Sequence, residues 1–348
     1  MQNKKTKSRI NSFSQRSANV MEKERRSPWL FVLLSLIVVV GIYYGYLRAT
    51  GVDIINEMKE NSMGLLFSAI MMLLAELVKA ARSYVIFKKT GYRVSFKNLV
   101  ISRFVGNFMG IVTPASFASE PGRVMSLAML EGTPLQAVMA IGVLETFYDS
   151  IMMATIALIF SLSKLPASIL VFISSFFILG LWGFILVAFV YKDSLFRKII
   201  YKFEEKMEKR IKNFSYRVLK RYTEFTDLTK TGLGRKLSLV SFLFTIASIL
   251  IYSVSFLTID TLSGGMPWQL LRGTIAYSSS YIMQVFPTPG GSGFFEYALS
   301  LTLNPEESAL WRMVYLFVNV IPASIILIFF VRIRFVIIEN IKKSIFDQ

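Results

Sequence analysis

The stretch YIMQVFPTPGGSGFFE, residues 281–296, decides how this chain folds, because it places a backbone break inside apolar sequence. Pro287 and Pro289 remove backbone N–H donors. Three glycines permit a left-handed backbone conformation and close approach of other groups to the backbone: Gly290, Gly291 and Gly293. Apolar residues on both sides of the turn disfavour a surface loop. Inside a membrane such a break is tolerated where it is buried in protein or lines a wet cavity. Half-helix N-termini there would direct free N–H groups at an anion such as a lipid phosphate.

The composition predicts a membrane protein. Of the 348 residues, 54% are hydrophobic and only 18% are charged, whereas soluble domains average about 25% charged residues. The sequence contains neither cysteine nor histidine, which excludes disulfides, thiolate or imidazole metal sites and Ser-His triads. We therefore expect an all-α, polytopic helical membrane protein without a cofactor, whose chemistry depends on carboxylates, arginine, lysine, hydroxyls and the backbone.

The positive charge is concentrated in a few segments. The net charge is +17, and residues 1–27, 192–236 and 332–348 carry +6, +8 and +2 of it, while residues 88–97 hold four basic and no acidic side chains. Basic segments beside apolar spans mark the cytoplasmic side of a membrane. Since these runs lie at the ends of spans, we expect them to face anionic lipid and not nucleic acid. The 192–236 segment alternates apolar with basic residues, which is typical of an amphipathic helix on the inner leaflet.

About six full crossings are expected, at residues 28–47, 63–87, 134–162, 166–191, 237–260 and 309–333. Two further apolar segments, 98–130 and 267–302, are broken in the middle by Pro, Gly and Ser. If each forms a re-entrant hairpin, all the basic segments lie on one side. The prediction is a basic tail (1–27), a single membrane domain (28–333) and a second tail (334–348), with both termini cytoplasmic.

The two breaks resemble each other. The first contains Thr113-Pro114-Ala115-Ser116 followed by Glu120, and the second contains Thr288-Pro289 followed by Glu296. With the topology above, span–hairpin–span occurs twice in opposite orientations, as an inverted repeat. Paired broken segments at matching places in two halves indicate a transporter site near the midplane.

Ionisable residues inside the apolar segments are candidates for function, because such residues are expensive in a membrane and usually face a cavity or the protein interior. Glu120 and Arg123 are three residues apart and could pair on one helix face. Glu145 and Asp149 are four apart and also share a face. They could form a proton relay, or one could pair with Arg103 or Arg123.

Other charged residues in apolar segments have simpler interpretations. Glu76, Lys79 and Arg82 repeat at helical spacing, and we expect Lys79 and Arg82 to snorkel from near the inner end of their span. Arg272 and Arg312 lie near apolar segments on the outer side. Either could hold a lipid headgroup or anchor a helix end.

The chain resembles a known family, the membrane region of lysylphosphatidylglycerol synthases and the stand-alone flippase-like proteins that share it. Three strings carry the resemblance: Pro114 followed by Glu120 and Arg123; Glu145-Thr146-Phe147-Tyr148-Asp149; and Pro287-Thr288-Pro289-Gly290-Gly291-Ser292-Gly293 with Glu296. Thr146 replaces the arginine of the family's Glu-Arg-x-x-Asp, and Ser119 replaces the glycine before Glu120. Arg103 or Arg123 could take over the role of that arginine.

The resemblance implies lipid translocation and not synthesis, because only about fifteen residues follow the last span, too few for a soluble transferase domain. We expect a non-enzymatic translocase in the plasma membrane of a prokaryote, moving an anionic or aminoacylated phospholipid or a lipid-linked substrate. The alternative functions are a lipid-modifying enzyme that uses carboxylates and a membrane partner of a soluble transferase. The sequence leaves open whether the protein forms a homo-oligomer. The substrate-binding residues would be Arg103, Thr113, Pro114, Ser116, Glu120, Arg123, Glu145, Asp149, Arg272, Pro287, Thr288, Pro289, Gly290, Gly291, Gly293, Glu296 and Arg312.

Overall fold

The computed structural model of the chain is helical and describes residues 33–187, 223–257, 259 and 266–346. A first helix, Leu33–Thr50, precedes α2. The labelled helices are α2 (Ile54–Glu60), α3 (Ser62–Lys89), α4 (Phe96–Ile111), α5 (Ser119–Glu131), α6 (Leu135–Ser163), α7 (Ile169–Ile185), α10 (Arg235–Val254), α11 (Met266–Met283), α12 (Phe294–Ser300) and α13 (Pro305–Phe346).

The prediction of a polytopic all-α protein is confirmed. Five of the described helices are long and apolar enough to cross a membrane: Leu33–Thr50, α3, α6, α10 and the Pro305–Ile328 part of α13. The apolar helix α7 matches the start of the expected fourth crossing. Residues 188–191 of that crossing, the tail 1–27 and most of the basic 192–236 segment lie outside the described residues.

Both broken segments fold as helix–turn–helix hairpins, α4–α5 and α11–α12. In the first hairpin, Gly106 and Gly110 are four residues apart on α4, which brings them to one face against the start of α5. A Cβ on Gly106 would lie 2.8 Å from the backbone oxygen of Ser119, and one on Gly110 would lie 3.0 Å from the Ser119 Cβ. The two helices therefore pack at backbone distance, which only glycine at these positions permits.

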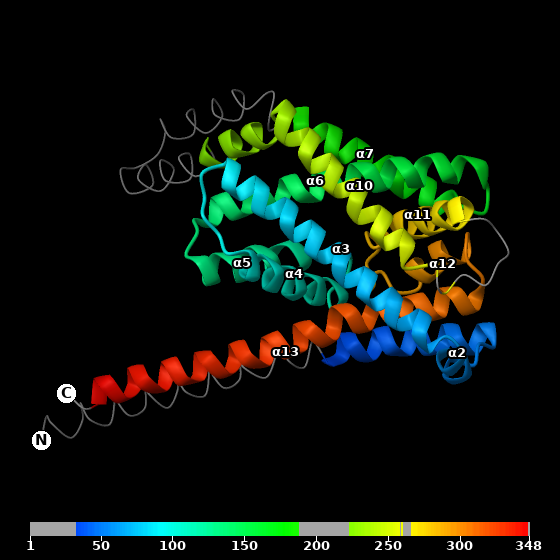
Figure 1. The fold of residues 1–348 in the computed structure, drawn as a ribbon, viewed down its shortest axis with the longest axis horizontal. Coiled ribbons are helices and arrows are strands. Elements are labelled where there is room, and N and C mark those ends of the chain that lie inside the picture. The colour runs from blue at the N-terminus through cyan, green and yellow to red at the C-terminus, as the bar shows by residue number, and fades with distance from the viewer. Residues whose placement is uncertain (1–32, 188–222, 258, 260–265, 347–348) are drawn as a thin grey trace, which may run out of the picture.

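The hairpins lie toward opposite ends of the helix bundle (Figure 1). α3 ends and α6 begins toward the left of the view, where the α4–α5 hairpin lies. The short helix α2 and the first turns of α13 lie on the right, on the side of α11–α12. The central helices make contacts across this arrangement, with α3 against α10 and α4, and α11 against α6. Each hairpin is thus enclosed by long helices.

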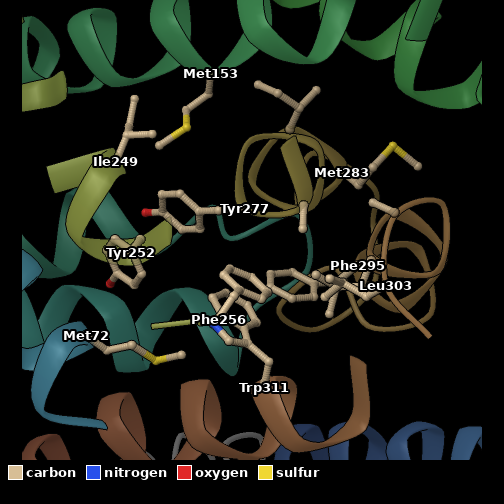
Figure 2. Close-up of a cluster of buried hydrophobic side chains, with 14 of the residues drawn as sticks. Met72, Met153, Ile249, Tyr252, Phe256, Tyr277, Met283, Phe295, Leu303 and Trp311 are labelled. Carbon is tan, nitrogen blue, oxygen red and sulfur yellow. The ribbon is translucent and has the colours of Figure 1, made fainter. Parts of the chain in front are cut away.

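Aromatic side chains fill the core where α10, α11, α12 and α13 meet (Figure 2). The rings of Tyr252 and Tyr277 stack with centroids 4.1 Å apart, and those of Phe256 and Trp311 stack at 4.5 Å. Trp311 also contacts Phe295 of α12 at 5.9 Å, and its Nε1 donates a 2.9 Å hydrogen bond to Ser255. This core fixes the second hairpin against the long helices around it.

Candidate functional site

The tips of the two hairpins contact each other. Pro114 and Pro289 form an isolated antiparallel bridge. The N–H of Ala115 donates to the carbonyl of Thr288 at 3.3 Å, and the N–H of Gly290 donates to the carbonyl of Thr113 at 3.4 Å. The two breaks that resemble each other in sequence are therefore adjacent in space, as part of one site.

The two tips also share a backbone conformation. In each, a proline is followed by two residues with positive φ: Ala115 and Ser116 (50° and 53°) in the first, and Gly290 and Gly291 (57° and 67°) in the second. Non-glycine residues rarely adopt this left-handed region. The matching geometry, with different residue types, extends the resemblance between the hairpins from sequence to backbone.

Eight ionisable side chains gather between α3, α4, α5 and α6, and we call them the charge cluster. Six are buried, whereas Arg123 keeps 11% and Glu120 keeps 40% of the side chain exposed. Four are acidic and four are basic, so that the formal charges cancel: Glu76, Glu120, Glu145, Asp149, Lys79, Arg82, Arg103 and Arg123. The cluster brings together five of the predicted site residues and three that were not among them, of which Lys79 and Arg82 were expected to snorkel.

Arg82 lies at the centre of the cluster and does not snorkel, which corrects the expectation from the sequence. Its side chain is fully buried. The guanidinium binds Asp149 through two contacts, Nη1–Oδ1 at 2.5 Å and Nη2–Oδ2 at 2.9 Å, and also donates to Thr245 of α10. Four helices contact α3, namely α4, α6, α10 and α13, so that Arg82 is enclosed by protein. In this position it forms a bidentate, charge-assisted pair with Asp149.

Glu145 is the acidic residue with the most partners. It forms an ion pair with Arg123 and accepts a hydrogen bond from Ser83. Arg103 Nη1 lies 3.8 Å from the same carboxylate, while Arg103 Nε is 3.0 Å from Glu76. Both arginines that the sequence offered as partners of the Glu145–Asp149 pair therefore approach Glu145, and Asp149 takes Arg82.

Lys79 is also held inside the protein and not at the inner end of its span, a second correction. Its ammonium lies 3.4 Å from Glu76, donates a 3.0 Å hydrogen bond to the Tyr277 hydroxyl and lies 4.8 Å from the centre of the Tyr252 ring. Tyr252 donates to Glu76 at 2.7 Å. The aromatic core and the charge cluster thus share a boundary, where a buried cation contacts two tyrosines.

Glu120 and Arg123 form the pair expected from their spacing, with Arg123 Nη2 2.6 Å from the Glu120 carboxylate. Glu120 lies in the first turn of α5, directly after the first tip, where the helix dipole favours a negative charge. It is the most exposed member of the charge cluster. The pair therefore links the tip to the buried part of the cluster.

A second ion pair supports the other tip. Glu296 in the first turn of α12 lies 2.9 Å from Arg312 of α13 and accepts a 2.6 Å hydrogen bond from the N–H of Gly293. The Arg312 guanidinium lies 4.0 Å from the centre of the Phe295 ring and donates to the carbonyl of Gly290 at 3.4 Å. Both charges are almost fully buried. This pair fixes the backbone of the second tip.

Arg272 contacts the start of α13 and belongs neither to the charge cluster nor to the Glu296–Arg312 pair. It pairs with Glu307 at 3.0 Å and donates to the carbonyl of Thr302 at 3.0 Å. These contacts join α11 to the start of α13. Of the two interpretations that the sequence left open for Arg272, the geometry matches a helix-end anchor.

The space within the charge cluster is small. A cavity of about 10 Å³ lies beside Ser83, Arg103, Arg123, Gly142 and Glu145, which is room for about one water molecule. One nitrogen of this wall, Arg103 Nη1, is buried without a hydrogen bond. A larger polar group can occupy the cluster only if ion pairs separate to admit it. As for metals, no group of three or more acidic side chains within the described residues is placed to hold an ion.

The family described as Lysylphosphatidylglycerol synthase TM region matches residues 29–321, which is most of the chain. The chain belongs to this family. The matched region contains both hairpins, the charge cluster and the Glu296–Arg312 pair. No curated protein sequence matches the chain. Membership confirms the resemblance seen in the three sequence strings and associates this multi-pass membrane fold with membrane lipids.

Proposed function

We propose that this member of the lysylphosphatidylglycerol synthase transmembrane family is a lipid translocase. It moves an anionic or aminoacylated phospholipid, or a related lipid-linked substrate, between leaflets without changing it chemically. The observation that carries the proposal is the charge cluster: eight ionisable groups, balanced in charge, on helices of a membrane protein. Intramembrane ionisable residues are rare and characteristically mark substrate or ion pathways and proton relays.

The equal number of acidic and basic groups in the charge cluster favours a headgroup that carries both a negative and a positive charge. A phosphate that takes Arg123 from Glu145 leaves a carboxylate free, and an ammonium on the same headgroup can then pair with that carboxylate. Such an exchange of partners leaves the total charge in the low-dielectric interior unchanged and avoids an unpaired buried ion, which is strongly unfavourable. Glu120, as the exposed member of its pair with Arg123, is the group that a headgroup meets first.

The hairpins enter the membrane from opposite faces in this proposal, and their tips meet near the midplane. The tip-to-tip bridge supports this arrangement, as does the outer surface of α5. An exposed apolar stripe follows the hairpin at intervals of four residues: Phe117, Pro121, Met125 and Met129. Residues spaced in this way lie on one helix face. An exposed apolar face of this kind suits contact with lipid better than contact with water.

The chain contains no Walker motif, so that translocation would run down a gradient or be coupled to protons through the carboxylates. The distribution of the basic segments favours a cytoplasmic location for both termini, in the prokaryotic plasma membrane that we propose for this protein. A soluble transferase that delivers aminoacylated lipid would approach from that side.

The proposal is tested by leaflet exchange of headgroup-labelled phospholipids in liposomes that contain the purified protein. Glu120→Gln, Arg123→Gln and Glu296→Gln are compared with Glu60→Gln, an exposed residue of α2. We expect the protein and the Glu60→Gln variant to accelerate exchange, and Glu120→Gln and Arg123→Gln to slow it at least tenfold. Thermal unfolding of each variant separates loss of transport from loss of fold, which matters most for the buried Glu296.

Three other outcomes would contradict the proposal. A change in the mass of the lipid on incubation with the protein would indicate an enzyme, with Glu145 and Asp149 as acid and base. Exchange that the wild type and all four variants accelerate equally would indicate nonspecific disturbance of the bilayer. Failure of every tested lipid to exchange, with and without a proton gradient, would favour a membrane partner of a soluble transferase.

A further inference from the structure

An apolar cavity of about 280 Å³ lies on the other side of α6 from the charge cluster. Its walls are Val143, Leu144 and Phe147 of α6, Trp182 and Ile185 of α7, and the segment 225–233 before α10. We propose that this cavity binds one hydrocarbon chain of a membrane lipid, and that this lipid is the one whose headgroup engages the charge cluster. The second part rests on the proposed function.

The lining of the cavity admits hydrocarbon and not water. The only hydroxyls on its wall, those of Thr226 and Thr229, donate to carbonyls of their own segment at 3.0 and 2.8 Å. An apolar cavity offers water no hydrogen-bond partners and stays dry or takes an apolar ligand. Between two apolar membrane helices, the surrounding solvent is lipid chains. A chain of methylene groups is therefore the ligand that the environment supplies.

Three contacts join the walls of the cavity to one another. The Phe147 and Trp182 rings meet edge to face with centroids 5.5 Å apart and join α6 to α7. The hydroxyl of Tyr148 donates to the carbonyl of Gly232 at 2.9 Å and contacts Ser238 Oγ at the same distance. The far wall is thereby tied to α6.

The depth of the cavity connects it with the charge cluster. Leu144 directly precedes Glu145, and Phe147 follows it by two residues. On a helix that rises 1.5 Å per residue, these positions differ in height by only about 2–3 Å. Val143 is eight residues, or about 12 Å, from the start of α6, a helix long enough to cross a hydrocarbon core of about 30 Å. A chain in the cavity thus lies at the height along α6 at which Glu145 holds Arg123, on the opposite face of the same helix.

The test uses the full chain in vesicles of phosphatidylglycerol that carries a diazirine in the middle of one acyl chain. After illumination, mass spectrometry locates the attached lipid. We expect attachment to the peptide containing residues 225–233, and also to Phe176, an exposed residue of α7 that serves as the reference for ordinary lipid contact. Val143→Phe fills the cavity and should lower attachment to residues 225–233 at least fivefold relative to Phe176, whereas Val143→Ala should retain it.

Two results overturn the proposal: labelling of Phe176 without labelling of residues 225–233 in the wild type, or equal labelling in the Phe and Ala variants. Leaflet exchange measured on the same samples separates the two proposals. If Val143→Phe loses attachment and slows exchange, both parts of the inference stand. If attachment is lost while exchange is unchanged, the cavity binds a lipid other than the transported one and the second part fails. If no sample exchanges lipid while attachment follows the variants, the proposed function fails and the chain site remains.

Discussion

The backbone at Pro114 pairs with the backbone at Pro289, so that two hairpins far apart in the sequence meet at their tips. Each tip receives one hydrogen bond from the other, Ala115 N–H to Thr288 and Gly290 N–H to Thr113. The exchange is reciprocal, as expected for two halves related by a twofold operation in the plane of the membrane. The contact between tips is small, which suits the proposed function, because the tips would have to separate for a headgroup to pass between them.

The left-handed residues of the tips provide a matched pair of substitutions. Gly290→Ala places a side chain where φ is +57° and where a Cβ would lie 3.2 Å from the Ile111 carbonyl oxygen. We expect destabilisation by about 1–2 kcal/mol from the backbone conformation alone. Ala115→Gly, at the matching position of the first tip, relieves the same strain and should leave the unfolding temperature unchanged or higher. Thermal unfolding in detergent, followed by tryptophan fluorescence, measures both.

The close packing of α4 on α5 leads to a second prediction. Gly106→Ala brings a methyl group to 2.8 Å from the Ser119 carbonyl oxygen, so the hairpin must open, and we expect a clear fall in the unfolding temperature. Gly180→Ala in α7 is the control, since a Cβ there meets nothing within 4 Å. It should stabilise slightly, because alanine is favoured over glycine in a helix by up to about 1 kcal/mol. A Gly106→Ala variant as stable as Gly180→Ala would contradict the packing.

The Arg82–Asp149 pair should be strongly coupled. Arg82→Leu or Asp149→Leu alone leaves a buried charge without its partner, at a cost of about 3–5 kcal/mol. The double variant removes both charges and should recover a large part of that loss. Arg48→Leu, an exposed arginine, should change little. Denaturant unfolding in mixed micelles gives the coupling, and additive losses in the double variant would show that the two side chains act independently.

The local features of the site could be predicted from the sequence. The Glu120–Arg123 pair follows from a spacing of three residues on one helix, and the two tips are visible as interruptions by proline and glycine in apolar sequence. These two inferences succeeded because each depends on neighbours in the chain. The inverted topology, which the distribution of basic residues favours, stays a prediction.

The pairing between helices could not be predicted in the same way. Arg82 was expected to reach the membrane surface, yet it is enclosed and binds Asp149 and Thr245 from two other helices. Nothing in the sequence near Arg82 specifies which helices surround it. Its spacing of three from Lys79 and of six from Glu76 was the available signal, since it places all three on one face. For Tyr252 and Tyr277 the sequence contained no such signal, because an aromatic residue in an apolar span ordinarily serves only to pack the core.

The membrane topology leads to the final prediction, which the absence of cysteine makes simple to test. Single cysteines are introduced at Lys89 and Leu135, which flank the first hairpin, and at Trp268, in the first turn of the second hairpin, and Glu306, which follows that hairpin. A re-entrant hairpin returns the chain to the side from which it came. A membrane-impermeant thiol reagent should therefore label Lys89→Cys and Leu135→Cys only from the cytoplasmic side, and Trp268→Cys and Glu306→Cys only from outside.

Ile159→Cys, on the exposed apolar surface of α6, is the control and should not react from either side, because the thiolate that reacts does not form in hydrocarbon. The decisive comparison is within each flanking pair. Lys89→Cys and Leu135→Cys labelled from opposite sides would mean that α4–α5 crosses the membrane. The tips would then not meet as parts of hairpins from opposite faces, and the exposed stripe on α5 would face lipid as part of a full span. Labelling of both from one side requires the turn at Pro114 to lie within the membrane or at its surface, and protection of Thr113→Cys from the same reagent distinguishes these two depths.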